Sequence, residues 1–248
     1  MSESPNEILS QSQSLEPGVY LLPVTMSDNN PNEVLPQRNI EIFHKIKYFF
    51  VENKRTARRF LKKIDKTIRI EELSLVELNE HTSDHEIPYM LEPLKRGFPI
   101  GIMSEAGCPG VADPGAKLVE LAQSNGFKVI PLVGPSSILL ALMGSGMNGQ
   151  NFTFNGYLPI EDKSRDVALR NMASLVQKSN TTQIFIETPY RNAKLFSRML
   201  EVLPGNIKLC VASDITGHHE SIITRTVSAW KKAKYNCDKI PTIFVLGL

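Results

Sequence analysis

The stretch SEAGCPGVADPG at residues 104–115 follows the apolar run IGIM and precedes a segment whose apolar residues have helical spacing. Three glycines and two prolines in these twelve residues favour an ordered turn whose backbone amides stay open to a ligand, since glycine carries no Cβ. In open α/β sheets, ligands bind beyond the carboxyl ends of the strands. An ordinary strand-to-helix turn fits the composition equally well, and the stretch is neither a dinucleotide fingerprint nor a P-loop.

A second stretch, GPSSILLALMGSG at residues 134–146, follows the run VIPL. Pro135 suits the start of a helix, and Ser136 and Ser137 would place hydroxyls and amides at its positive end. A carboxylate or an adenine edge would be bound there. The alternative is a capped, buried helix without a ligand.

Around these two stretches, strand-like and helical segments alternate. We expect strands at residues 19–23, 47–51, 75–78, 100–103 and 129–132, with helices at 36–45, 56–66, 87–96, 115–125 and 136–143. This alternation predicts a parallel sheet covered by helices.

A Gly-rich polar segment at residues 144–150 is typical of a linker. Beyond it we expect strands at 152–154, 183–187, 208–212, 221–227 and 242–246, and helices at 165–176, 192–202 and 228–234. Two hairpin-like strands near the end indicate a mixed sheet. The predicted organisation is a disordered tail (1–16), an N-terminal α/β domain (17–148) and a C-terminal α/β domain (149–248).

Composition excludes several classes of protein. The 248 residues carry a formal net charge of +2, which does not indicate a general polyanion binder, so that any nucleic-acid role needs a local patch. The three cysteines have no spacing typical of a disulfide framework or a zinc site. No signal core or membrane-spanning run is present in the sequence. We therefore expect a soluble cytoplasmic protein without a metal.

The ordered set of motifs resembles the tetrapyrrole-methylase superfamily. The two stretches above carry most of this resemblance, with GVYLLPV, FFVENKRTARRFL, LNEH, FNGYLPIEDKSR, IFIETPYR, CVASDITGHHESI and IPTIFVLG following the same order over about residues 18–248. Within the superfamily, these blocks look most like the bacterial small-subunit ribosomal RNA ribose 2′-O-methyltransferases that modify a cytidine.

The resemblance implies two unlike α/β domains, usually as a homodimer, with S-adenosylmethionine in the cleft between them. Carried over by position, it implies cofactor contacts at Pro23, Gly107, Cys108, Pro109, Val111, Ser136, Ser137, Ile186, Ala212 and Thr242. Ordinary strand packing explains Ala212 and Thr242 equally well.

The chain departs from the ribosomal branch where substrate would lie. Residues 24–30 replace a Thr-Pro-Ile-Gly-Asn loop, Asn53 and Lys54 replace Asp-Thr, and residues 213–217 replace an Arg-Glu-Leu-Thr-Lys stretch. A C-terminal helical extension has no counterpart. These differences bear on the substrate more than on the cofactor.

Residues 45–69 hold ten lysines and arginines but only two acidic residues, Glu52 and Asp65. On a helix, Lys54, Arg58, Lys62 and Lys66 recur every fourth residue with Arg55, Arg59 and Lys63 beside them, and these seven form one basic stripe that repels itself unless an anion meets it. We interpret the stripe as a surface that follows phosphates, and a merely solvated helix face is the alternative. The substrate candidates are Glu52, Lys54, Arg55, Arg58, Arg59, Lys62, His81, Glu187 and Arg191.

A ribose hydroxyl is a weak acid, so its methylation benefits from a base. Glu52, His81, Glu187 and Asp214 sit at expected strand ends, but no spacing singles one out, and the catalytic residue stays unassigned. His218 and His219 fit no standard metal site together with His81.

Three functions remain open. The first is methyl transfer to ribosomal RNA. The second is methylation of a small tetrapyrrole-like molecule, whose carboxylates would meet the basic stripe. The third is a non-catalytic paralogue that binds RNA or the cofactor, which the altered first loop and Asn53-Lys54 motivate.

Overall fold

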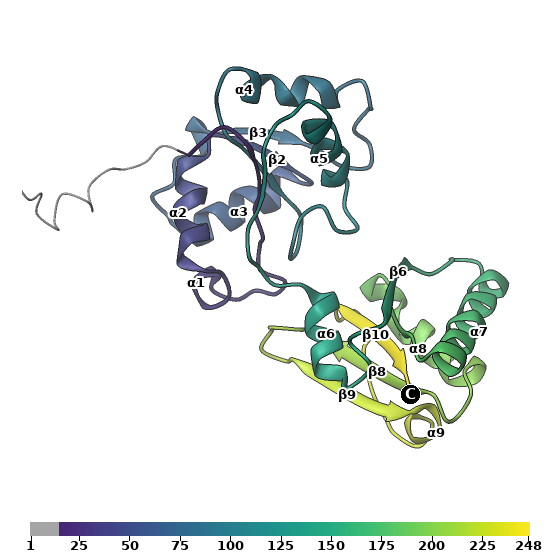
Figure 1. Ribbon diagram of the computed structural model, residues 1–248. Helices are drawn as coiled ribbons and strands as arrows, with labels where there is room; N and C mark the ends of the chain where they lie inside the picture. The colour runs from purple at the N-terminus through teal and green to yellow at the C-terminus, as the bar shows by residue number, and fades with distance from the viewer. Residues whose placement is uncertain (1–14) are drawn as a thin grey trace, which may run out of the picture. The chain divides into compact units, whose positions relative to one another are not determined.

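The computed structural model describes residues 15–248. The tail expected over residues 1–16 therefore lies outside the described residues, except for Leu15 and Glu16. The described chain forms two compact units (Figure 1). The first holds residues 15–24 and 30–134, and the second holds Thr25–Asn29 and Pro135–Leu248.

The first unit is built on a fully parallel five-stranded sheet with strand order β3-β2-β4-β1-β5. Its strands are β1 (Val19–Leu21), β2 (Tyr48–Val51), β3 (Ser74–Glu77), β4 (Ile100–Met103) and β5 (Val129–Pro131). The expected parallel sheet is confirmed. Because all five strands run the same way, their carboxyl ends meet at one edge.

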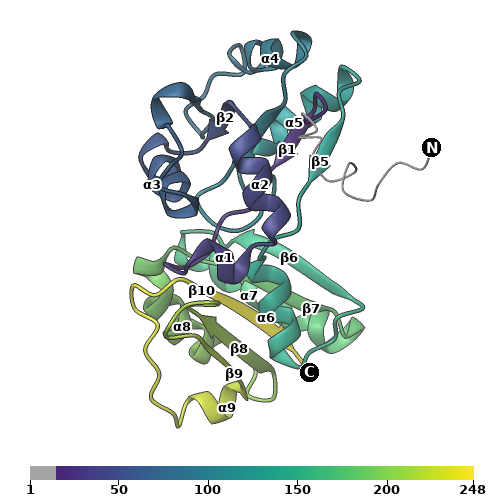
Figure 2. The same cartoon turned by 90° about the vertical axis from the view of Figure 1, so that its left-hand side faces the viewer.

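Helices cover both faces of this sheet (Figure 2). They are α1 (Pro31–Val34), α2 (Gln37–Lys45), α3 (Lys54–Ile64), α4 (Glu92–Lys95) and α5 (Gly115–Ser124), with 3-10 turns η1 (Ile70–Glu72) and η2 (Ile87–Leu91). Side chains alternate along each strand. Phe49 and Val51 therefore pack with α2 and α3, while Phe50 packs with η2, α4 and α5.

Gly101 at the middle of the sheet leaves no room for a side chain. A Cβ at this position would lie 2.5 Å from Leu22 Cδ1 and 3.3 Å from both Ile46 and Phe49. The large side chains of the neighbouring strands and of the segment after α2 fill that space instead. Gly101 thus lets the apolar layer close over the central strand.

The second unit is built on a mixed five-stranded sheet with order β6-β7-β10-β8-β9. Its strands are β6 (Phe152–Tyr157), β7 (Thr182–Ile186), β8 (Lys208–Ser213), β9 (Ser221–Thr226) and β10 (Thr242–Gly247). Strands β6 and β7 are parallel, and the other pairs are antiparallel. The edge strand β6 is irregular, because its register against β7 shifts between Phe154 and Tyr157, where Gly156 has φ +64°.

The helices of the second unit are α6 (Ser137–Ser145), α7 (Asp162–Ser179), α8 (Asn192–Val202) and α9 (Val227–Trp230), with the 3-10 turn η3 (Pro189–Arg191). One face of the sheet packs against α6, and the other packs against α7, α8 and α9. Phe185 and Phe244 point to the α7 face, while Ile184 and Val245 point to the α6 face. Within residues 15–248, no helix combines the length and apolar content that crossing a bilayer requires.

Several element boundaries differ from the sequence expectation. The helix expected at 87–96 is a 3-10 turn followed by one short α-helix, with Pro88 and Pro93 each near the start of its segment. The helix expected at 228–234 ends at Trp230, and α1 was not expected. The division between units falls at residues 134 and 135 rather than at 148, because α6 packs onto β8 and β10.

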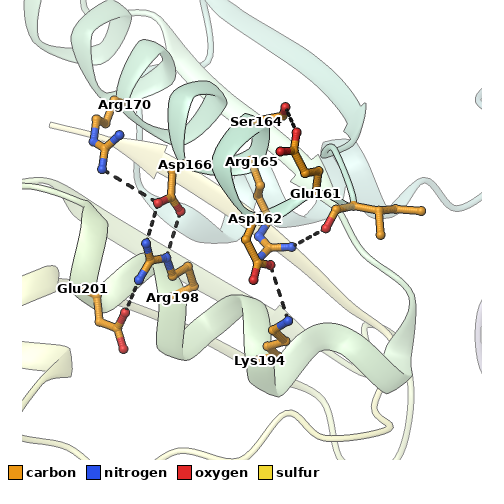
Figure 3. Close-up of polar contacts among 10 residues, drawn as sticks. Glu161, Asp162, Ser164, Arg165, Asp166, Arg170, Lys194, Arg198 and Glu201 are labelled. Carbon is orange, nitrogen blue, oxygen red and sulfur yellow. Dashed lines mark hydrogen bonds and ion pairs between the residues drawn. The ribbon is translucent and has the colours of Figure 1, made fainter.

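Charged side chains join α7 to α8 (Figure 3). Arg198 on α8 donates two hydrogen bonds to the Asp166 carboxylate on α7, and the one from Nε to Oδ1 is 2.8 Å long. Arg198 also bonds Glu201, and Arg170 approaches Asp166 at 3.8 Å. The hydrogen bonds from Arg198, and the nearby charges of Arg198 and Arg170, hold the pKa of Asp166 below its usual range. Lys194 reaches Asp162 at 3.4 Å in the same way, so the two helices are tied at two places.

Trp230 anchors the end of α9 in the core. Its side chain is 1% exposed and donates a 2.7 Å hydrogen bond from Nε1 to the Leu209 carbonyl. Its ring packs edge-on against Phe196 and Tyr235, with centroids 5.4 and 5.3 Å away. Arg225 lies over the ring at 5.0 Å. One side chain therefore combines apolar burial, aromatic packing and a satisfied polar group.

Trp230→Phe is expected to lower the free energy of unfolding by about 1–3 kcal/mol, because the Leu209 carbonyl loses a buried donor. Trp230→Ala adds a cavity and is expected to cost about 3–5 kcal/mol. Urea denaturation followed by circular dichroism measures both. Tyr190→Ala, at a side chain 79% exposed, is the control and stays within about 0.5 kcal/mol of the unchanged protein. Equal losses for Phe and Ala would refute the role given to the hydrogen bond.

Candidate functional site

The loop at residues 104–115 leaves the carboxyl end of β4 in a conformation that few residues adopt. Gly107, Gly110 and Ala112 have φ values of +70°, +83° and +59°. Glycine occupies such backbone without strain, whereas Ala112 does so at a cost. Gly107 also accepts a 2.9 Å hydrogen bond from Val24 N, which ties the loop to the segment after β1. The Gly-rich stretch is thus an ordered turn.

Asp113 braces this loop from inside. Its two carboxylate oxygens accept hydrogen bonds from the backbone N–H groups of Gly110, at 2.7 Å, and Gly115, at 2.8 Å. Burial raises the pKa of the Asp113 carboxyl, although both hydrogen bonds work in the opposite direction. A Cβ at Gly115 would lie 2.9 Å from Ile102 and from Asp113. The loop and the start of α5 are therefore fitted closely to each other.

A hollow of about 480 Å³ lies between this loop, α5 and the ends of β1 and β5. It is lined by Leu21, Cys108, Pro109, Gly110, Val111, Ala116, Val119, Glu120, Gln123, Pro131 and Leu132. Three of the residues predicted to bind the cofactor, Cys108, Pro109 and Val111, lie in this lining. Its volume falls in the range of small-molecule pockets, about 300–1,000 Å³.

Two further residues of the predicted set adjoin this hollow in the chain. Gly107 immediately precedes its lining, and the buried Pro23 follows the end of β1. Pro23 packs so tightly on Gly134 that a Cβ at Gly134 would overlap it. Burial raises the pKa of the Cys108 thiol. Cys108 is therefore suited to packing rather than to nucleophilic attack.

A second hollow of about 630 Å³ lies at the carboxyl ends of β2, β3 and β4 and is rich in carboxylates. It is lined by Glu52, Asn53, Asn79, Glu80, Glu105, Ala112, Asp113, Pro114 and Lys117. Strand β4 continues into α5 on one face of the sheet, whereas β2 continues into α3 on the other. Such a reversal is where open α/β sheets bind ligands.

Glu52 is the central acid of this second hollow. Its Oε2 accepts a 2.7 Å hydrogen bond from Glu105 N, and its backbone carbonyl accepts one of 3.3 Å from Asn79 Nδ2. Thr56 Oγ1 donates to the Glu105 carboxylate. Burial, and then the nearby charges of Asp113 and Glu105, raise the pKa of the Glu52 carboxyl. Nevertheless, among residues 15–248 no group of three or more His, Cys, Asp or Glu side chains is arranged to hold a metal ion.

Helix α3 starts beside this hollow and carries the basic stripe. Asn53 caps it, accepting a hydrogen bond of 2.8 Å from Arg55 N. Buried Ala57, Leu61 and Ile64 form its inner face. The predicted substrate residues Arg55, Arg58, Arg59 and Lys62 are exposed, and Lys54 is partly exposed. Lys66, expected at the end of the helix, lies just beyond it.

In the second unit, three of the residues predicted to bind the cofactor lie together on adjacent strands. Ile186 on β7 and Ala212 on β8 both pair with Ile243 on β10, next to Thr242. Thr242 Oγ1 lies 2.8 Å from Ser213 Oγ. Ser136, also in the predicted set, is the N-cap of α6 but makes no side-chain capping bond, and Ser137 is the first residue of that helix.

The structure shows other partners for three candidate bases. Glu187, whose side chain is 2% exposed, forms a 2.6 Å ion pair with Arg191. Asp214 accepts hydrogen bonds from Ser27 Oγ at 3.1 Å and from His219 N at 2.9 Å, which shape the turn after β8. His81 is largely exposed and lies 3.6 Å from Glu80.

Sequence reasoning missed Asn79, Glu105 and Asp113. Asn79 and Glu105 lie two residues after the ends of β3 and β4, and Asp113 lies inside the quoted Gly-rich stretch. Their position after a strand could have identified Asn79 and Glu105 as candidates, because the same criterion selected Glu52 and His81.

The chain was compared with known proteins, and no family model matches it. It is 29% identical to "Ribosomal RNA small subunit methyltransferase I" of Vibrio cholerae over 83% of this chain and 67% of that protein. It is 34% identical to the protein of the same name from Mesorhizobium japonicum over 61% of this chain and 50% of that protein. The chain thus spans about half to two thirds of the length of these curated relatives.

Solved structures share the fold at low sequence identity. Diphthine synthase has a TM-score of 0.63 at 12% identity, with 92% of this chain and 88% of that chain covered. The methyltransferase CobJ has a TM-score of 0.60 at 14% identity, with 92% of each chain covered. Cobalt precorrin-4 methyltransferase, a cobalamin biosynthetic enzyme, has a TM-score of 0.58 at 11% identity, covering 92% of this chain and 94% of that chain. The chain is therefore similar in sequence to proteins named ribosomal RNA small subunit methyltransferase I, and it shares its fold with CobJ and cobalt precorrin-4 methyltransferase.

Proposed function

We propose that this protein transfers a methyl group from S-adenosylmethionine to a ribose 2′-hydroxyl of small-subunit ribosomal RNA. The braced loop at residues 104–115, with an apolar hollow on one side and a carboxylate-rich hollow on the other, is the observation that carries the proposal. The sequence relatives are named for this RNA, which supports the choice of acceptor. A homodimer in the cytoplasm belongs to the same proposal and rests on the family resemblance.

The residues around the first hollow fit the cofactor. Apolar side chains such as Leu21, Val111 and Val119 suit the faces of an adenine ring, and the loop offers main-chain groups beside them. When bound, S-adenosylmethionine supplies a methyl group that its sulfonium already activates. The protein must then hold the acceptor oxygen in line and at near-attack distance.

Glu52 is the residue that we propose takes the proton of the acceptor hydroxyl. Its Oε2 is held by Glu105 N at 2.7 Å, which fixes the carboxylate, while its Oε1 accepts no hydrogen bond from residues 15–248. Burial raises its pKa above that of an ordinary glutamate, which makes the carboxylate a stronger base. It lines a hollow of about 630 Å³ at the carboxyl ends of the strands, whereas Glu187 is paired with Arg191 and Asp214 shapes the turn after β8.

The first prediction tests the reaction itself. With tritiated S-adenosylmethionine and small ribosomal subunits from cells that lack the protein, label is expected to enter the RNA. A 2′-O-methyl group blocks cleavage of the adjacent phosphodiester in alkali, so the label should stay in an alkali-resistant dinucleotide. Subunits from cells that contain the protein are the control and should take up little label. Label confined to a base, or transfer only to a small tetrapyrrole, would contradict the proposal.

The second prediction concerns the two hydrogen bonds that the Asp113 carboxylate accepts from the backbone of the loop. Asp113→Asn leaves one of the two backbone N–H groups facing an amide NH₂, so the loop loses a charge-assisted hydrogen bond. Affinity for S-adenosylmethionine is expected to fall about tenfold, which corresponds to about 1.4 kcal/mol, in isothermal titration calorimetry. Asp238→Asn, at an exposed site in the second unit, is the matched control. Unchanged affinity in a folded Asp113→Asn variant would rule out this loop as part of the cofactor site.

The third prediction concerns pH. A base acts only when ionised, and the pKa of Glu52 is raised, so transfer is expected to fall off with decreasing pH earlier than an ordinary glutamate would cause. Glu52→Gln is expected to slow transfer about 100-fold or more and to remove this acidic limb. The measurement is kcat against pH at saturating RNA. Persistence of the acidic limb in Glu52→Gln would assign it to another group.

A further inference from the structure

The outer face of α3 carries several exposed positive charges that do not stabilise the helix. Arg55, Arg58 and Arg59 are exposed, and none forms an ion pair with an acidic side chain of the described chain. Like charges four residues apart, such as Arg55 with Arg59 and Arg58 with Lys62, destabilise an isolated helix. Arginines in the first turns also oppose the helix dipole. Helix stability therefore does not explain this face.

The stripe ends at a hollow of about 570 Å³ beside the C-terminal end of α3. It is lined by Asn30, Asn32, Lys62, Lys63, Ile64, Asp65 and Lys66, of which three are lysines and two are asparagines. Its one acid is already engaged. Asp65 accepts hydrogen bonds from Thr67 N at 2.7 Å and Thr67 Oγ1 at 2.8 Å, and it lies 3.5 Å from His44. Lys62 Nζ donates a 3.0 Å hydrogen bond to the Lys66 carbonyl, and an ammonium group has further N–H donors that suit a phosphate oxygen.

The direction of α3 connects this hollow with the carboxylate-rich one. The helix begins at the carboxyl end of β2, beside Glu52, and its last turn borders the lysine hollow. Its eleven residues span about 16 Å at about 1.5 Å each. One strand of a duplex advances about 3.4 Å per phosphate, so the helix matches about five phosphates.

We propose that this face of α3 binds the backbone of the substrate RNA and that the lysine hollow seats a phosphate several nucleotides away from the methylated ribose. This inference rests on the proposed function, because it takes the acceptor at Glu52 to be part of an RNA. Negative and positive groups lie at different places along the helix. The carboxylates beside its start would contact the ribose hydroxyl, and the lysines and arginines along its length would bind the phosphates. Phosphate contacts of this kind position an RNA without reading its sequence.

The test uses the full chain and a fluorescein-labelled single-stranded RNA copied from small-subunit ribosomal RNA. Fluorescence anisotropy gives the binding constant over a series of KCl concentrations. Each phosphate contact contributes about 0.7 to the slope of log K against log salt for single strands. Lys62→Gln with Lys66→Gln is expected to reduce the slope by about 1.4. Arg55→Gln, Arg58→Gln and Arg59→Gln together are expected to reduce it by about 2.

The matched control is Lys231→Gln with Lys232→Gln, which removes two exposed cations from the second unit. Its slope is expected to stay unchanged, and circular dichroism verifies that every variant is folded. Glutamine keeps helix propensity close to that of lysine and arginine, so α3 should persist. Equal slope changes in the control and the Lys62/Lys66 variant would overturn the proposal, since net charge alone would then account for them.

The remaining outcomes separate this inference from the proposed function. Methyl transfer to ribosomal RNA with an unchanged slope in the α3 variants overturns the inference and leaves the function standing. Reduced slopes without any methyl transfer support the inference and overturn the function. Absence of RNA binding by the unchanged protein at low salt overturns the inference directly. So does a result in which the α3 variants weaken binding only of a polycarboxylated tetrapyrrole.

Discussion

The parallel pairing of β4 with both β1 and β2 is the constraint on which the first unit depends. Parallel pairing brings the carboxyl ends of all five strands to one edge, so that loops distant in sequence lie side by side there. Because Gly101 carries no side chain, the neighbouring apolar residues close over β4. The loop after β4 thereby reaches the segment after β1 through Val24 and Gly107, and the end of β2 through Glu52 and Glu105. Without that pairing, neither hollow would have its walls.

Charge is distributed unevenly around this edge. Carboxylates gather where the strands end, and burial makes them costlier to ionise. Arginines and lysines begin one turn later, on the exposed face of α3. A polyanion would be repelled by the first group and attracted by the second, so that only an uncharged part of it, such as a sugar hydroxyl, would approach the carboxylates closely. This distribution of charge would therefore direct the phosphates of an RNA to α3 and an uncharged sugar hydroxyl to the carboxylates.

The sequence predicted the fold class, most elements of both sheets and the family resemblance. These features were predictable because apolar runs and glycine-proline stretches depend on the local sequence of one segment alone. It did not predict the division at residue 134, since the contact of α6 with β8 and β10 depends on pairing between distant strands. Nor did it single out Glu52 from His81, Glu187 and Asp214. Only three-dimensional contacts show that Arg191 engages Glu187 and that Asp214 shapes a turn.

The irregularity in β6 has a consequence for the behaviour of the protein at high concentration. An edge strand offers unpaired N–H and C=O groups, and a long, regular one invites the edge of another molecule. In β6 the register shift and the left-handed Gly156 interrupt the row of groups after three residues. A foreign strand would find too short a regular ladder to extend, which protects this sheet from aggregation through its β6 side.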